Sequence, residues 1–175
     1  MIAAAIMSSR SVSTRFRTIR TLVLLIVFVA GVVANTDAAP KNFHIVAQFT
    51  NSAFGATAAI ADNDIWAVGT GPGAPHPAGV IEHWDGTSWS VVPSPNPFPN
   101  VNNSLDAVAA ASANDIDAFG DSPLGPFSEH WNGTQWSIIN APSGVARMIG
   151  ATAISDGTVV AVGQGTNGSA VILHN

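Results

Sequence analysis

Short runs of apolar and β-branched residues recur along this chain between turn-forming residues, with no sustained 3.6-residue periodicity after residue 34. One such run ends in glycine: IWAVG at 65–69 returns as IDAFG at 116–120 and as VVAVG at 159–163. Each copy follows a run of small residues and a turn that contains Asp or Asn. Runs of this length, with turn residues about every 8–12 positions, are typical of an all-β fold. We therefore predict strands and no helices in this region.

A second motif repeats downstream of each glycine: EHWDGTSWS at 82–90 returns as EHWNGTQWS at 129–137. The two copies are 47 residues apart. Asp-Gly and Asn-Gly favour both central positions of a type I′ turn, which joins the two strands of a hairpin. We predict two hairpins from this motif, one from 80–84 into 87–92 and one from 127–131 into 134–139.

Partial copies of the motif lie near both ends of the repeats. NFHIVA at 42–47 matches the second arm of the hairpin, and AVILH at 170–174 matches the first arm. Units of four antiparallel strands that recur every ~40–50 residues are typical of β-propeller blades. We predict an all-β fold of antiparallel blades with a strand at 42–47, blades at 48–93 and 101–142, and a partial blade at 146–175.

The repeats also resemble a known family. HWDGTSWSVVPSP and HWNGTQWSIINAP each follow a glycine-terminated strand, as in kelch repeats, and the pattern DIWAVG followed by IEHWDGTxWS is similar to bacterial kelch-like propellers. The resemblance covers roughly residues 42–175 and implies a β-propeller. It departs at Gly69, Gly120 and Gly163, which are single where kelch repeats carry a pair of glycines.

About three blades are too few for a closed ring, because propellers generally have four to eight. One interpretation is a homodimer by strand exchange, in which residues 42–47 complete the third blade of the partner and form a six-bladed ring. The other is an open array, as a fragment or degenerate relative of a longer propeller. The sequence leaves both alternatives open.

The N-terminal segment resembles an export signal. Residues 1–20 contain four arginines and no acidic residue, and 22–34 is an apolar run. These features predict a helical signal peptide at 1–34, cleaved after Ala34 or Ala38, a short linker at 35–41 and a secreted product. The alternative is an uncleaved membrane anchor, although the apolar run is shorter than the ~20 residues of a comfortable span.

Charge and composition exclude several functions. After cleavage at Ala34, only Lys41 and Arg147 remain as cations beside eleven acidic residues, a net charge of −9. Nucleic-acid binding needs a basic surface, so no nucleic-acid partner is predicted. The chain has no Cys and no Tyr, which the copper-radical oxidases among propellers require, and too few arginines for a sialidase. We predict a non-enzymatic recognition or scaffold module without metal or cofactor. The alternatives are a truncated or degenerate relative of a glycan-active propeller enzyme, which these absences disfavour, and a fragment with no independent function.

Candidate binding residues lie in the longer loops, because binding residues concentrate on loops held by a rigid scaffold. The loops after each second and fourth strand are expected at one end of the blades, where they carry little charge and suit a neutral glycan or an extended polypeptide. The candidates at this end are His76, Asn100, Asn103 and Asp121.

Other polar and aromatic residues have simpler structural interpretations. The histidines and glutamates of the EHW motif recur once per repeat, so we assign them structural roles, and we expect the five tryptophans to lie in the core. The exception is Asp117, which takes the strand position occupied by Trp66 and Val160 in the other repeats. A charge inside a strand is costly unless it is exposed or paired, so we predict an open face or a function there.

Overall fold

The computed structural model describes residues 44–139, 141, 143–154 and 156–175. The chain divides into two units, Met1–Val46 and Ala47–Asn175, and every described strand belongs to the second. The predicted signal peptide at 1–34, the linker at 35–41 and the first two residues of the predicted strand 42–47 lie outside the described residues.

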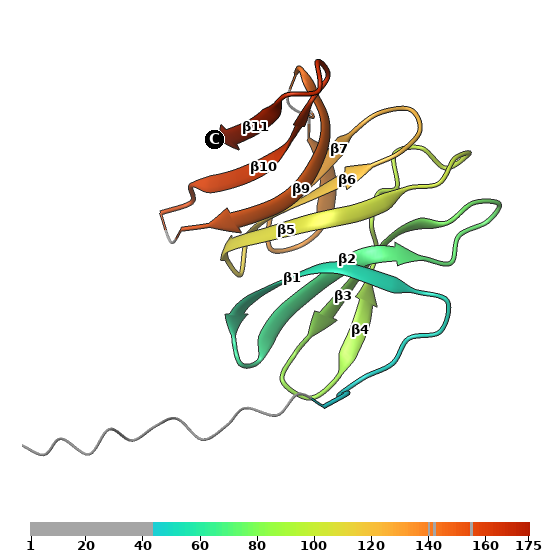
Figure 1. Cartoon of the computed structure of the whole chain (residues 1–175). Coiled ribbons are helices and arrows are strands. Elements are labelled where there is room, and N and C mark those ends of the chain that lie inside the picture. Colours follow the sequence, from blue (N-terminus) through green and yellow to red (C-terminus); the bar gives the residue numbers. More distant parts are fainter. Residues whose placement is uncertain (1–43, 140, 142, 155) are drawn as a thin grey trace, which may run out of the picture. The chain divides into compact units, whose positions relative to one another are not determined.

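Three antiparallel sheets follow one another along the chain (Figure 1). The first sheet consists of β1 (Ala53–Ala61), β2 (Asp64–Gly71), β3 (Ala78–Trp84) and β4 (Trp89–Val92). The second consists of β5 (Ser104–Ser112), β6 (Asp115–Asp121), β7 (Phe127–Trp131) and β8 (Trp136–Ile139). The third consists of β9 (Val145–Ala153), β10 (Val159–Gly165) and β11 (Ala170–His174). The predicted all-β class is confirmed, with no helix among the described residues.

The predicted strand at 42–47 is not formed in the part that the structure describes. Residues 44–47 have no strand pairing, and Ile45 and Val46 are 75% and 77% exposed. A strand forms its hydrogen bonds with a neighbouring strand. The sequence match to β4 and β8 predicted a strand at 42–47, but it did not identify a neighbouring strand in the same chain. The third sheet therefore has three described strands, whereas the first two sheets have four.

Both predicted hairpins are present, but their turns are not type I′. Trp84 pairs with Trp89, so four residues connect β3 to β4. A type I′ turn requires a positive φ at both central residues. Gly86 has a φ of 94°, but Asp85 does not have a positive φ. Instead, Asp85 Oδ1 accepts hydrogen bonds from the backbone N–H groups of Thr87 and Ser88, both at 2.8 Å. Short-range capping by the Asp side chain thus determines the turn, and Asn132 does the same in the second hairpin.

The sheets approach one another most closely along their first strands. β1 lies beside β5, and β5 lies beside β9, as Figure 1 shows. These strands are rich in Ala, Gly and Thr, whose short side chains permit close approach. The outer strands β4 and β8 carry the tryptophans Trp89 and Trp136 at their starts.

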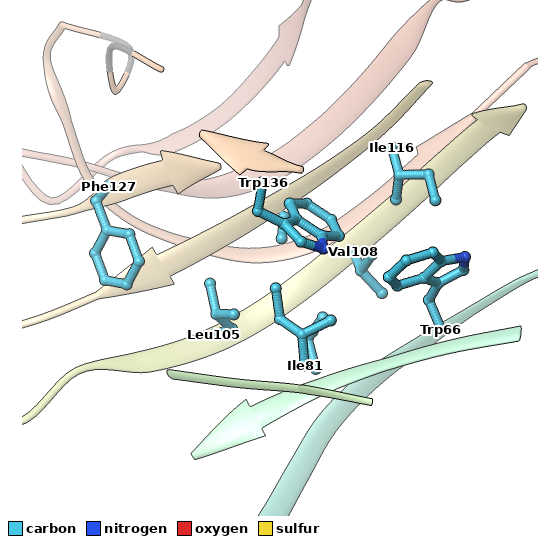
Figure 2. Packing of buried hydrophobic residues seen from close by; sticks show 9 residues of the cluster. Trp66, Ile81, Leu105, Val108, Ile116, Phe127 and Trp136 are labelled. Atoms are coloured by element: carbon cyan, nitrogen blue, oxygen red, sulfur yellow. The ribbon is translucent and has the colours of Figure 1, made fainter. Parts of the chain in front are cut away.

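Two apolar clusters fill the spaces between the sheets. The first lies between the first and second sheets, where Trp66, Ile81 and Leu105 are at most 3% exposed and the ring of Trp136 lies 5.7 Å from that of Trp66 (Figure 2). The second lies between the second and third sheets and includes Phe119 and Met148. The second cluster is built largely from smaller side chains and contains no Trp.

The glycines that end the predicted motif face the backbone of the first strand in each sheet. A Cβ at Gly69 would overlap the carbonyl oxygen of Ala53, and one at Gly163 would overlap that of Arg147. The strand pairing has a register shift beside each site. Close backbone approach, rather than an unusual backbone angle, therefore explains why glycine occupies these positions.

Replacing Gly69 by alanine is expected to destabilise the protein by about 2–3 kcal/mol, since the contact is with backbone and overpacking typically costs 1–3 kcal/mol. Gly150→Ala is the matched control: its added methyl would meet only the Val162 side chain, at 3.3 Å. Its cost should stay below about 1 kcal/mol. Urea unfolding of both variants measures the difference, and equal midpoints would contradict the close-approach explanation.

Candidate functional site

Three connecting loops border an open hollow at one end of the first two sheets, and most of its lining residues have polar side chains. Its volume is about 500 Å³, and we call it the loop hollow. It is formed by the β2–β3, β4–β5 and β6–β7 connections and the strand ends beside them. Its lining residues are Thr70, Pro77, Asn102, Asn103, Ser104, Asp121, Ser122 and Pro123.

Asn103 organises the loops around this hollow. Its Nδ2 donates to the carbonyl oxygens of Phe98 at 2.7 Å and Val101 at 2.8 Å, and its backbone N–H donates to that of Pro77 at 3.0 Å. Asn103 as a whole is only 2% exposed. Its Oδ1 is buried and has no hydrogen-bond partner among the described residues. Leaving a buried acceptor unpaired costs ~1–3 kcal/mol, so a donor supplied at this position would be stabilising.

The loop hollow brings together two of the four residues singled out in the sequence. Asn103 and Asp121 both line it, whereas His76 and Asn100 are exposed in neighbouring loops and do not. Sequence reasoning missed Thr70, Ser104 and Ser122 as lining residues. Their small polar side chains carry no distinctive motif, and only the approach of three loops reveals them.

The side chains that line the loop hollow favour ligands with neutral or weakly cationic hydrogen-bond donors. Its lining includes the carboxylate of Asp121 and no Lys, Arg or His. The described residues contain a single Lys or Arg, Arg147, whose Nε lies 3.6 Å from Asp106 on the sheets. An anionic ligand would therefore meet no compensating charge, whereas hydroxyl or amide donors would find oxygen acceptors.

The repeated histidines hold the strands together through carboxylates. His83 Nε2 lies 2.9 Å from Asp64 Oδ1, the same atom that accepts a hydrogen bond from Trp66 Nε1. The His83 ring also stacks on Trp66, with centroids 4.2 Å apart. These contacts give the predicted structural roles a physical basis in the first sheet.

Asp117 changes this arrangement in the second sheet. Its Oδ1 lies 2.8 Å from His130 Nδ1, while Asp115, which corresponds to Asp64, lies farther away at 3.9 Å. The side chain of Asp117 is 13% exposed. It lines a cavity of about 230 Å³ between the second and third sheets, which we call the inter-sheet cavity. The charge is thus both paired with a histidine and close to open space.

Two glutamates of the EHW motif are buried. Glu129 is fully buried, and its carboxylate accepts hydrogen bonds from Ser94 Oγ at 2.9 and 3.0 Å. Burial raises its pKa to about 7, although the Ser94 hydroxyl and the Asn96 backbone partly oppose that shift. Burial also raises the pKa of Glu82, which is 3% exposed.

Neither comparison with known proteins assigns a family: no protein-family model matches the chain, and no curated protein shows significant similarity to it. The described part of the chain holds no group of three or more His, Asp or Glu side chains arranged to bind a metal ion. None of its described segments forms a helix of the length and apolarity that crossing a bilayer requires.

Proposed function

We propose that the three sheets are blades of a kelch-like β-propeller array. The proposal is supported by the repeated motif and by the close approach of β1, β5 and β9, since propeller blades place their first strands nearest a common axis. The tryptophans of β4 and β8 then belong to the wide outer part of each blade. The array is open, with about three blades in this chain.

We further propose that the protein is an exported, non-enzymatic recognition module whose loop hollow binds a neutral glycan. A single observation carries this proposal: Asn103, whose buried Oδ1 has no hydrogen-bond partner among the described residues, and the acidic residue Asp121 line the same loop-built hollow. Sugar hydroxyls are donors that match such acceptors. Export follows from the signal-like sequence at 1–34, where a cleaved signal leaves the protein outside the cytoplasm.

Asp121→Asn is expected to weaken binding of neutral oligosaccharides by tenfold or more, because hydrogen bonds to charged groups contribute ~1.5–3 kcal/mol. The probe is an array of neutral oligosaccharides, followed by titration calorimetry on any sugar that binds. Asp62→Asn is the matched control, because it makes the same charge change at the exposed β1–β2 turn. Its affinity should equal that of the wild type.

Two results would count against the glycan proposal. If no oligosaccharide binds while a library of extended peptides does, and Asp121→Asn weakens that binding, the ligand is a polypeptide. If Asp121→Asn and Asp62→Asn bind any ligand equally well, the loop hollow is not the recognition site.

A further inference from the structure

The third sheet has an open edge where the other two sheets have a fourth strand. β11 corresponds to β3 and β7 in the repeat, and those strands pair on their outer side with β4 and β8. β11 pairs with β10, but no strand among the described residues pairs with its other edge. An open edge of this kind is a template for adding a strand from another chain.

The inter-sheet cavity lies beside this open edge. Leu173 of β11 and Ile139 of β8 line it together with Phe119 and Met148. At the equivalent place between the first and second sheets, the space is filled by Trp136, the first residue of a fourth strand. A cavity of ~150 Å³ accommodates benzene, so about 230 Å³ is room for an aromatic side chain. The cavity thus lies where the aromatic residue of a fourth strand belongs.

The chain itself contains a segment with the matching sequence. NFHIVA at 42–47 aligns with WSVV of β4 and WSII of β8, with Phe43 at the tryptophan position. Its described part forms no strand and leaves Ile45 and Val46 exposed. An unpaired apolar strand sequence and an unpaired strand edge are therefore present in the same protein.

The geometry favours a segment from another copy over the segment of the same chain. Ala47 and the start of β1 at Ala53 are six residues apart, which spans at most about 22 Å. Two sheet-to-sheet spacings of about 10 Å each separate β1 from the third sheet. Within that sheet, three strand spacings of about 5 Å each lead from β9 to the position beyond β11. The combined distance exceeds the reach of the connecting residues.

The exposed face of the third sheet also indicates a second copy. Ile149, Val162 and Ile172 are 60%, 41% and 77% exposed on the face opposite the second sheet. In the first two sheets, the corresponding face is covered by the next sheet of the repeat. In the repeat, the second sheet covers the first and the third covers the second, and the first sheet of another copy has an equivalent face that could cover the third. A second copy therefore supplies both a fourth strand and a sheet that covers the exposed face.

We propose that residues 42–47 of a second copy add to the third sheet as its fourth strand, antiparallel to β11, with Phe43 in the inter-sheet cavity. The register follows from β3 and β4, in which Ile81 pairs with Val92. Val46 then lies opposite Ile172, and Ile45 lies opposite Leu173. Exchange in both directions gives a two-fold symmetric dimer. The interaction does not involve the loop hollow, so this proposal and the proposal of glycan binding can be tested independently of each other.

Cysteine cross-linking tests both the partner and the register, because the natural chain has no Cys. Two differently tagged full-length chains, one with Val46→Cys and one with Ile172→Cys, are mixed and oxidised. Directly opposite strand positions suit a disulfide, so a covalent dimer carrying both tags is expected. Val46→Cys mixed with Ala170→Cys is the control, since two residues of slip place the Cα atoms beyond the ~7 Å limit.

A second measurement tests the cavity. Phe43→Ala is expected to raise the dimer dissociation constant at least tenfold in sedimentation experiments, and Phe43→Trp should restore it. His44→Ala, whose side chain points to the opposite face of the added strand, should change it less than twofold. Both candidate cleavage positions, after Ala34 and after Ala38, leave the segment in place.

Three results would overturn the proposal. The first is a monomeric mass at all concentrations with no cross-linked dimer. The second is a disulfide within single chains of the Val46→Cys/Ile172→Cys double variant, which would show that the chain pairs with its own segment. The third is a dimer whose stability is unchanged by Phe43→Ala, which would leave the inter-sheet cavity without a role.

Discussion

Replacing Trp136 by alanine is expected to lower the free energy of unfolding by about 3 kcal/mol. Trp136 is 6% exposed and contacts Trp66 and Trp131, with ring centroids 5.7 and 5.9 Å away. Truncation of a buried Trp costs ~3–5 kcal/mol. The indole Nε1 is buried without a partner among the described residues, and its removal offsets part of that cost.

Trp89→Ala provides a matched control for this prediction. Trp89 occupies the same repeat position as Trp136, but it is only half-buried, because no preceding sheet covers the first sheet among the described residues. Its loss should cost about 1 kcal/mol. Urea unfolding followed by far-ultraviolet circular dichroism measures both variants without relying on Trp fluorescence.

Trp136→Phe provides a second test of this prediction if Trp136→Ala fails to fold. It keeps a ring between the sheets and removes the unpaired N–H, so its cost should stay near 1 kcal/mol. Equal losses for Trp89→Ala and Trp136→Ala would contradict the prediction, because they would show that the outer face of the first sheet is covered in solution.

Glu129 is expected to make the protein less stable as the pH rises from about 4.5 to about 7. Burial raises its pKa from 4.5 to about 7, so the folded state retains a proton that the unfolded state has lost. The stabilising contribution is fully present below pH 4.5 and is lost as the pH rises through 7. With 1.36 kcal/mol for each unit, the total change is about 3 kcal/mol.

Glu129→Gln should remove this pH dependence. The neutral amide remains able to accept a hydrogen bond from Ser94, so the variant should match the wild type near pH 4.5 and exceed its stability by about 3 kcal/mol at pH 8. Glu82→Gln is the control: the Glu82 pKa is also raised by burial, but its sheet lacks a covering neighbour among the described residues, so its effect should be smaller. Unfolding curves from pH 4.5 to 8 measure both.

Asp85 and Asp156 act in a separate pH range. Backbone N–H groups of Ser88 and Thr87 lower the pKa of Asp85, and that of Thr158 lowers the pKa of Asp156. Their contribution is present above the ordinary Asp pKa and is lost in more acidic solution. These two turns therefore cannot produce a slope between pH 5 and 7. A slope in Glu129→Gln as steep as that of the wild type would contradict the assignment to Glu129.

The local elements of this fold could be predicted from the amino-acid sequence. Turn residues between β-forming runs predicted the strands, and repetition of the EHW motif predicted the two hairpins. The second strand of each hairpin begins two residues later than predicted, at Trp89 and Trp136. Period-two patterning and turn chemistry act over a few residues, so they can be recognised without knowing the tertiary structure. The turn type was predicted wrongly, because the Asp85 side chain competes with the backbone preference of the Asp-Gly pair.

The different roles of equivalent residues in the repeats depend on tertiary packing and could not be predicted from the sequence. Trp89 and Trp136 have similar local sequences, but a neighbouring sheet buries only the second. Asn103 and Asp121 share a hollow because three loops meet, and residues 44–47 form no strand although their sequence matches β4 and β8. Burial, cavities and strand partners depend on segments far apart in the chain, and a repeated local pattern carries no information about which of its copies has a neighbour.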